Sequence, residues 1–411
     1  MAGMESNSPS LLVTQDKDSG TSHPANGLGR REFLRVTGIT AFGLGFNLHR
    51  CLAEAASGSA VPGEDIIVGL EIGTSKVCAA VAQRLPDGTI KLLGIGQVPS
   101  RGVGRYRILD LEAVSACVRT ALLDAEAKSV VKIRSVALAL AGIKITPYPS
   151  GPALKRIFEW EKICYADRGD GVLCGISMAE CKRARDLRVV AGANSRIYNF
   201  IRCLKDIGVE VERIIFAPVA SAEAVLSANQ KKLGALVIDM GEGTTDYAVY
   251  DGGVLALSDS LPVGGKNIAN DLSIGLRIPL ACAEKVAIKE GGVKLGLSLP
   301  REYQRIVIES KPGFAGREIE REVLNTIVHH RVRQAFDVVK WRLVNTGVRL
   351  DSLRAGVRLT GGCSVISGIC ELAEDVFGIP ACIARVKGIS DPASILENPK
   401  YSCVIGLVKL S

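Results

Sequence analysis

One sequence module occurs twice in this chain, once from Asp65 and again from Gly234. Each copy begins with a short apolar run, turns through a glycine-containing segment into a second apolar run, and reaches a third after an Asp-Gly pair. Apolar runs separated by such turn residues predict a three-stranded antiparallel meander. The predicted strands are 66–70, 77–82 and one from Ile90 in the first copy, and 235–238, 247–250 and 254–257 in the second. A chain of 411 residues built on this repeat is expected to be bilobal or to hold two domains.

Each copy ends its first strand with a carboxylate, Glu71 in the first and Asp239 in the second. A tight Gly-Thr-Ser or Gly-Thr-Thr hairpin follows, and its successive N–H groups and hydroxyls are suited to bind an anion. Two such hairpins facing each other would hold a polyphosphate, whose Mg²⁺ keeps several waters and is held by one or two carboxylates. Taken singly, either hairpin is also compatible with an ordinary glycine-containing turn. The repetition of hairpin and carboxylate favours the phosphate site.

A third glycine element lies near the C-terminus, where an apolar strand turns through Gly361 and Gly362 into a helix expected to begin near Val365. This order lets the backbone approach a ligand closely, although a β-α turn without a ligand has the same pattern. Between the second and third elements a helix is predicted, with Glu284 and Lys285 on its polar face. That face is either solvated or one wall of an adenosine pocket.

The composition supports an α/β fold and excludes several functions. Only 5% of the residues are aromatic and 44 are glycine, so the apolar mass is aliphatic, as in buried parallel sheets. The formal charge of +8 comes from basic residues interspersed with acids, which argues against nucleic-acid binding. The 12 cysteines include no C-x-x-C pair and there are four histidines, so no disulfide framework, zinc site or histidine triad is expected.

The first 64 residues differ in character from the rest. Residues 1–29 are polar and are expected to be disordered. Arg30 and Arg31, an apolar run and an Ala-Glu-Ala sequence then resemble a twin-arginine export signal. An interfacial anchor and a fortuitous upstream extension are the alternatives, since the run is too short to span a bilayer. The domain that follows favours the cytoplasm over export.

The order of these elements resembles the actin/Hsp70/sugar-kinase ATPase superfamily. A more specific resemblance, to the bacterial cell-division family FtsA, runs from about Asp65 to the end of the chain. The stretches that carry it are Ile67–Val77, Leu85–Gly88, Pro99–Gly102, Leu138–Gly142, Asp239–Asp246, Leu359–Gly362 and Tyr401–Leu407. The resemblance implies a bilobal actin-like fold, Mg-ATP between the lobes, self-association into filaments, and recruitment of the tubulin-like protein FtsZ to the inner membrane surface at the division site.

The resemblance also implies residue roles. Phosphate contacts fall to Gly73, Thr74, Ser75 and Lys76 of the first hairpin and Gly241, Gly243, Thr244 and Thr245 of the second. Glu71 and Asp239 would hold hydrated Mg²⁺, and Gly361, Gly362, Glu284 and Lys285 would surround the adenosine. The acidic-apolar FtsZ tail would meet Arg317, Arg321 and Arg331, unless these only form a solvated face. No general base stands out, so the catalytic residue is unassigned and at most slow hydrolysis is expected.

The implied domains follow the family pattern. After the extension at 1–64, one large subdomain (1A) comprises 65–142, 191–232 and 396–411, with a shortened small domain at 143–190. The second lobe comprises a subdomain 2A, at 233–267 and 330–395, and a subdomain 2B, at 268–329.

Three features depart from the family. Glu242 stands where the second hairpin usually has glycine, and it would repel a nucleotide unless its side chain turned to solvent. The small domain is shortened, which puts filament contacts in question. The chain stops at Ser411 without the usual linker and amphipathic membrane helix, so we hypothesise that residues 30–52 serve as an interfacial anchor.

Two other functions fit parts of the pattern. A small-molecule kinase of the same superfamily would need a catalytic carboxylate, for which Asp246 is the obvious candidate, but no sugar-binding insertion is apparent. A degenerate binding module, exported or related to pilus assembly, would explain Glu242 and the shortened domain as loss of ATP use.

Overall fold

The computed structural model describes residues 65–105, 107–141, 144–145, 164–167, 172–176, 188–191, 194–296, 300–390 and 397–411. The expected N-terminal extension, with its signal-like segment, lies outside the described residues. The predicted small domain at 143–190 is described only in four short backbone segments.

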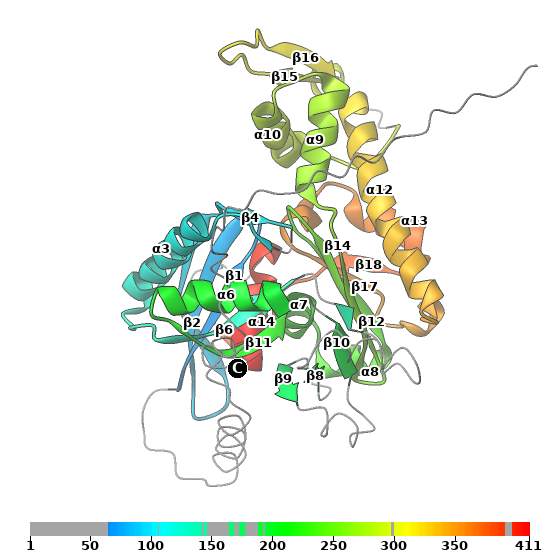
Figure 1. Ribbon diagram of the computed structural model, residues 1–411. Coiled ribbons are helices and arrows are strands. Elements are labelled where there is room, and N and C mark those ends of the chain that lie inside the picture. Colours follow the sequence, from blue (N-terminus) through cyan, green and yellow to red (C-terminus); the bar gives the residue numbers. More distant parts are fainter. Residues whose placement is uncertain are drawn as a thin grey trace, which may run out of the picture. The chain divides into compact units, whose positions relative to one another are not determined.

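Both copies of the module form the predicted antiparallel meander (Figure 1). The strands are β1 (Asp65–Ile72), β2 (Lys76–Arg84) and β3 (Ile90–Pro99), and then β12 (Ala235–Met240), β13 (Thr245–Asp251) and β14 (Val254–Leu261). The hairpins are closed by the same bond, because the Gly73 N–H donates to the Lys76 carbonyl at 2.9 Å and the Gly241 N–H to the Thr244 carbonyl at 2.8 Å. The duplication seen in the sequence is therefore a duplication of backbone geometry.

Parallel strands extend each meander into the α/β arrangement that the composition predicts. β1 pairs with β6 (Ser135–Leu140) and β6 with β11 (Glu210–Phe216). In the same way β12 pairs with β17 (Val357–Thr360) and β17 with β18 (Ala381–Ile383). The short strands β7 (Lys144–Ile145), β10 (Arg188–Ala191), β8 (Cys164–Asp167) and β9 (Val172–Ile176) run between β14 and β11, and β19 (Ile389–Ser390) pairs with β3. The result is one mixed sheet whose two ends repeat the same strand order.

Helices follow the strands in both copies. The first copy carries α3 (Leu111–Ser129), α6 (Asn194–Asp206), α7 (Ala217–Val225) and α8 (Ala228–Leu233), and a small hairpin of β4 (Val103–Gly104) and β5 (Arg107–Ile108). The second carries α9 (Gly265–Leu276), α10 (Leu280–Glu290), α11 (Arg301–Gln304), β15 (Arg305–Ile308), β16 (Arg317–Glu320), α12 (Arg321–Asn345) and α13 (Ile369–Phe377). The last helix of the chain, α14 (Ser402–Leu410), returns to pack on β1, β2 and β6 of the first copy. Short 3₁₀ turns lie at Leu350–Ser352, Gly362–Val365 and Pro399–Tyr401. Within the described residues, no helix is long and apolar enough to cross a membrane.

The helix expected to begin near Val365 starts later. A 3₁₀ turn occupies Gly362–Val365, and α13 begins only at Ile369. The delay has a backbone cause, because Gly368 adopts a φ of 84°, a left-handed conformation that interrupts a right-handed helix. The helix start at this position was predicted wrongly.

The helices α7 and α14 pack directly against each other and connect the two copies (Figure 1). Gly406 of α14 lies so close to α7 that a Cβ there would be 1.7 Å from the Ala220 carbonyl oxygen. The other side of α14 is equally tight, since a Cβ on Gly69 of β1 would be 2.8 Å from the Val404 carbonyl oxygen. α14 is thus held between α7 and the first half of the sheet at backbone contact distance.

We expect Gly406→Ala to destabilise the protein. Overpacking a close-packed core costs about 1–3 kcal/mol, and the upper end applies because the opposing atom is a carbonyl that cannot rotate away. Urea denaturation should therefore show a free energy of unfolding lower by about 3 kcal/mol. Gly362→Ala is the matched control, since no atom lies within 4 Å of a Cβ built there. Equal stability of the two variants would contradict the tight packing.

Candidate functional site

A cavity of about 400 Å³ lies where the two hairpins meet. It is lined by most of the residues that the sequence predicts for a nucleotide site, namely Glu71, Gly73, Thr74, Ser75, Lys76, Asp239, Gly241, Thr244, Glu284, Gly361 and Gly362. These residues are far apart in the sequence and come together because each hairpin projects from the end of its own first strand. The fold therefore gathers the three glycine elements around one space.

The first hairpin carries an ion pair. The Lys76 ammonium lies 2.6 Å from the Glu71 carboxylate, and both side chains are largely buried. Burial alone would lower the pKa of Lys76, but the nearby negative charge of Glu71 outweighs it and raises the pKa above its usual range. Lys76 is therefore a fixed positive charge on the cavity wall.

Asp239 of the second copy lies in a different environment. Its carboxylate accepts a hydrogen bond from the Ser221 hydroxyl at 2.5 Å and touches the Gly361 backbone, where a Cβ would be 2.2 Å from Oδ1. Burial raises the pKa of Asp239 to about 7; the Ser221 bond opposes the shift, while Asp246 and Glu71 add to it. Near neutral pH a cation that binds beside this carboxyl group would favour loss of its proton to the solvent.

Ser221 was not found by sequence reasoning. It lies in α7, fully buried, and its alanine-rich surroundings carry no motif. Only the packing of α7 under β12 brings its hydroxyl to Asp239.

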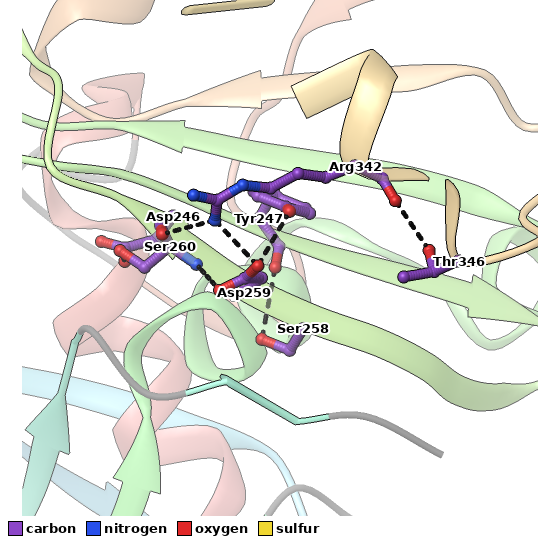
Figure 2. Close-up of polar contacts among 7 residues, drawn as sticks. All are labelled: Asp246, Tyr247, Ser258, Asp259, Ser260, Arg342 and Thr346. Carbon is purple, nitrogen blue, oxygen red and sulfur yellow. Dashed lines mark hydrogen bonds and ion pairs between the residues drawn. The ribbon is translucent and has the colours of Figure 1, made fainter. Parts of the chain in front are cut away.

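Asp246 also lines the cavity and belongs to a buried polar network (Figure 2). It accepts hydrogen bonds from the Thr244 hydroxyl at 2.9 Å and from the Ser260 hydroxyl. Arg342, in the last turn of α12, donates to the Asp259 carboxylate at 2.9 Å and to the Ser260 carbonyl at 3.2 Å. The network joins the second hairpin to α12 through β14.

The start of α9 is a second feature that the sequence reasoning missed. The Gly265 N–H donates to the Gly241 carbonyl at 3.0 Å, and the Lys266 N–H donates to the Glu242 carbonyl at 2.8 Å. These donors hold the second hairpin in place, and Gly265 and Lys266 also line the cavity. The signal was present as a Gly-Gly-Lys sequence between an apolar strand and a helix.

Three residues predicted for the nucleotide site do not line the cavity. Gly243 is buried against the first hairpin, where a Cβ would be 2.5 Å from the Thr74 hydroxyl oxygen. Thr245 is buried and donates its hydroxyl to the Val263 carbonyl at 2.8 Å. Lys285 is exposed on α10, whereas its neighbour Glu284 lines the cavity.

The three arginines predicted for partner binding have separate surroundings. Arg317 is exposed on β16. Arg331 forms an ion pair with Asp271, with Nε 2.5 Å from Oδ2. Arg321 pairs with Glu290 at 2.7 Å, and its side chain lines a second cavity of about 230 Å³ near the start of α12.

Comparison with known proteins agrees with this architecture. Residues 236–406 match the family model described as cell division protein FtsA. The cell division protein FtsA of Neisseria meningitidis serogroup B is 32% identical over 370 residues, which cover 82% of this chain and 88% of that protein. FtsA of Pseudomonas aeruginosa is 30% identical over 374 residues, which cover 84% of this chain and 88% of that protein.

Solved structures with much lower identity have the same fold. The PilM–PilN type IV pilus biogenesis complex matches with a TM-score of 0.60 at 15% identity, covering 84% of this chain and 98% of the other. MreB5 of Spiroplasma citri bound to ADP matches with a TM-score of 0.53 at 19% identity, covering 84% and 95%. The fold is that of the actin-like ATPases, as expected. Given identity of 30% or more over most of both chains, this protein belongs to the FtsA family of cell division proteins.

Proposed function

We propose that this protein binds Mg-ATP in the cavity between the two hairpins and acts in cell division as an actin-like scaffold. The observation that carries the proposal is the meeting of two hairpins with the same closing bond and an acidic residue at the same strand position. A site with this symmetry supplies backbone N–H groups and hydroxyls from both sides, which suits a phosphate chain.

The lining residues fit both the nucleotide and its metal. A volume of about 400 Å³ lies within the range of small-molecule sites. Lys76, Lys266 and Lys400 supply positive charge, while Glu71 and Asp239 supply the carboxylates that a hydrated Mg²⁺ prefers. When bound, the metal would neutralise phosphate charge; Gly361 would let the backbone pass close to the nucleoside.

The partner we propose is the C-terminal tail of FtsZ, bound at the second cavity. Its lining includes Arg321 and Tyr303, whose side chain is 58% exposed. Asn325 also lines it, and the Asn325 Oδ1 atom is buried without a hydrogen-bond partner among the described residues. The lining holds two basic residues, Arg321 and Lys294, one acid, Glu290, and an aromatic and an amide side chain, and this mixture suits an acidic-apolar peptide that displaces Glu290 from Arg321. Arg317 would approach such a peptide from β16. Arg321 and Arg331 each pair with an acid, Glu290 and Asp271, and only Arg321 lines the second cavity.

Linking FtsZ to the inner face of the membrane and self-association into filaments complete the proposed role. We propose the same division of the chain into subdomains that the family pattern predicts. We also hypothesise that residues 30–52 bind the protein to the membrane surface.

Titration calorimetry of Mg-ATP with the full chain tests the nucleotide site. We expect micromolar binding, and at least tenfold weaker binding by Asp239→Ala, about 1.4 kcal/mol or more, because one of two metal carboxylates is lost. Glu112→Gln, an exposed residue in the first turn of α3, should bind like the wild type. A folded wild-type protein that binds no nucleotide would favour the degenerate binding module.

The raised pKa of Asp239 predicts a pH-dependent stability in Mg-free buffer. Because the folded state binds this proton more tightly than the unfolded chain, the contribution of Asp239 to stability falls as pH rises from about 4 to 7. Asp239→Asn removes the titration and can still accept the Ser221 bond. Its stability advantage over the wild type should grow by about 2–4 kcal/mol across this window and level off above pH 7. Urea denaturation at several pH values measures it; a pH-independent difference would contradict the assignment.

Fluorescence anisotropy with a labelled peptide of the FtsZ tail from the same organism tests the partner site. Arg321→Ala should weaken binding at least tenfold, because the peptide loses a charge-assisted contact. Arg305→Ala is the matched control, since Arg305 lies on neighbouring β15 in an exposed ion pair with Glu318. Equal affinities of both variants and the wild type would place the peptide elsewhere. Circular dichroism should first establish that Arg321→Ala is folded, because Arg321 also pairs with Glu290.

A further inference from the structure

Glu242 lies at the tip of the second hairpin, and its side chain turns into the cavity. It is half-buried and lines the cavity with the hydroxyl-bearing residues of the first hairpin. Burial raises the pKa of the Glu242 carboxyl group and the Ser75 hydroxyl opposes this shift, so the two side chains, which line the same cavity, lie near each other. Of the two orientations considered from the sequence, the side chain therefore adopts the one that faces a nucleotide.

The contact between the hairpins extends beyond these two side chains. The residue after Glu242, Gly243, lies against Thr74 so closely that a Cβ would be 2.5 Å from the Thr74 hydroxyl oxygen. Glu242 and Ser75 thus bridge two hairpin tips that already touch. The bridge is one side chain long and crosses from the second copy of the module to the first.

The backbone of the second hairpin is held from behind by α9. The Glu242 carbonyl accepts the Lys266 N–H at 2.8 Å, and a Cβ on Gly264 would be 2.5 Å from that carbonyl oxygen. Because the backbone has no room to retreat, the Glu242 side chain has to rotate for a further phosphate to take its place between the tips.

The Glu242 carboxylate uses groups that the last phosphate of a nucleotide would need. It shares the cavity wall with the Ser75 hydroxyl and the Lys266 ammonium group, which favour its charged form, and with Glu284, which disfavours it. A terminal phosphate at the same tips would seek the same hydroxyl and the same ammonium group, and the negative charges would repel each other at short range. The carboxylate therefore competes with a third phosphate and leaves space for two.

We propose that Glu242 occupies the place of the terminal phosphate, so that the site prefers a nucleoside diphosphate to a triphosphate. The proposal rests on the proposed nucleotide site and adds its specificity. A triphosphate binds only after the Glu242 side chain has left Ser75, and a diphosphate binds with the bridge intact. Glu242 is in this sense a specificity-determining residue.

Competition with a fluorescent ADP analogue in the presence of Mg²⁺ measures the dissociation constants of ADP and ATP for the full chain. For the wild type we expect ATP to bind at least about tenfold more weakly than ADP. Glu242→Gln keeps the shape but removes the charge, and Glu242→Gly removes the bridge. Both variants should bind ATP about tenfold more tightly with little change in ADP affinity. Glu112→Gln should retain the wild-type ratio.

The outcomes separate this proposal from the nucleotide site itself. If the wild type binds both nucleotides equally and Glu242→Gln changes neither affinity, the proposal is overturned and the nucleotide site stands. If neither the wild type nor any variant binds a nucleotide, both fail. If the wild type binds ADP and only the Glu242 variants bind ATP, Glu242 excludes the triphosphate completely: the preference for a diphosphate is supported, and the expectation of micromolar ATP binding by the wild type is overturned.

Discussion

The backbone contact between α7 and α14 is the constraint on which the rest of the structure depends. α7 contacts β12 and α14 contacts β1, and Gly406 lets α14 approach Ala220 of α7 closer than any side chain would allow. This contact fixes the two first strands, β1 and β12, and thereby the hairpins at their ends. Because the two hairpins are brought together by this packing, residues of both copies line one cavity.

The two copies use their equivalent carboxylates differently. Glu71 is paired with Lys76 and stays close to a fixed positive charge. Asp239 has Ser221 as its hydrogen-bond donor and acidic neighbours, so its pKa lies near 7. Backbone duplication thus preserves the positions of the acids, while the side chains packed around them give each acid a different hydrogen-bonding and ionic partner.

The similarity to distant solved structures shows that the fold is retained when most of the sequence differs. Chains only 15–19% identical have the same fold over most of their length, which shows that strand order and helix packing tolerate wide substitution. Glu242 lies on a hairpin that is closed by the same backbone bond as the first hairpin of this chain. The Glu242 carbonyl accepts the hydrogen bond from the Lys266 N–H whatever its side chain, so an acid at this position is compatible with the fold. We expect the Glu242 side chain to influence only which ligand enters the cavity.

The sequence by itself determined the duplicated meanders, the hairpins with their acids, and the family, because alternating apolar runs, glycine turns and short motifs are local signals. It placed the start of α13 wrongly, since the left-handed Gly368 follows from packing. Ser221 and the capping of the second hairpin by α9 needed tertiary structure, because their partners are distant in the chain. The orientation of the Glu242 side chain and the ion pair of Arg331 with Asp271 also needed the tertiary structure. The orientation of a polar side chain depends on which donors and charges the fold brings beside it.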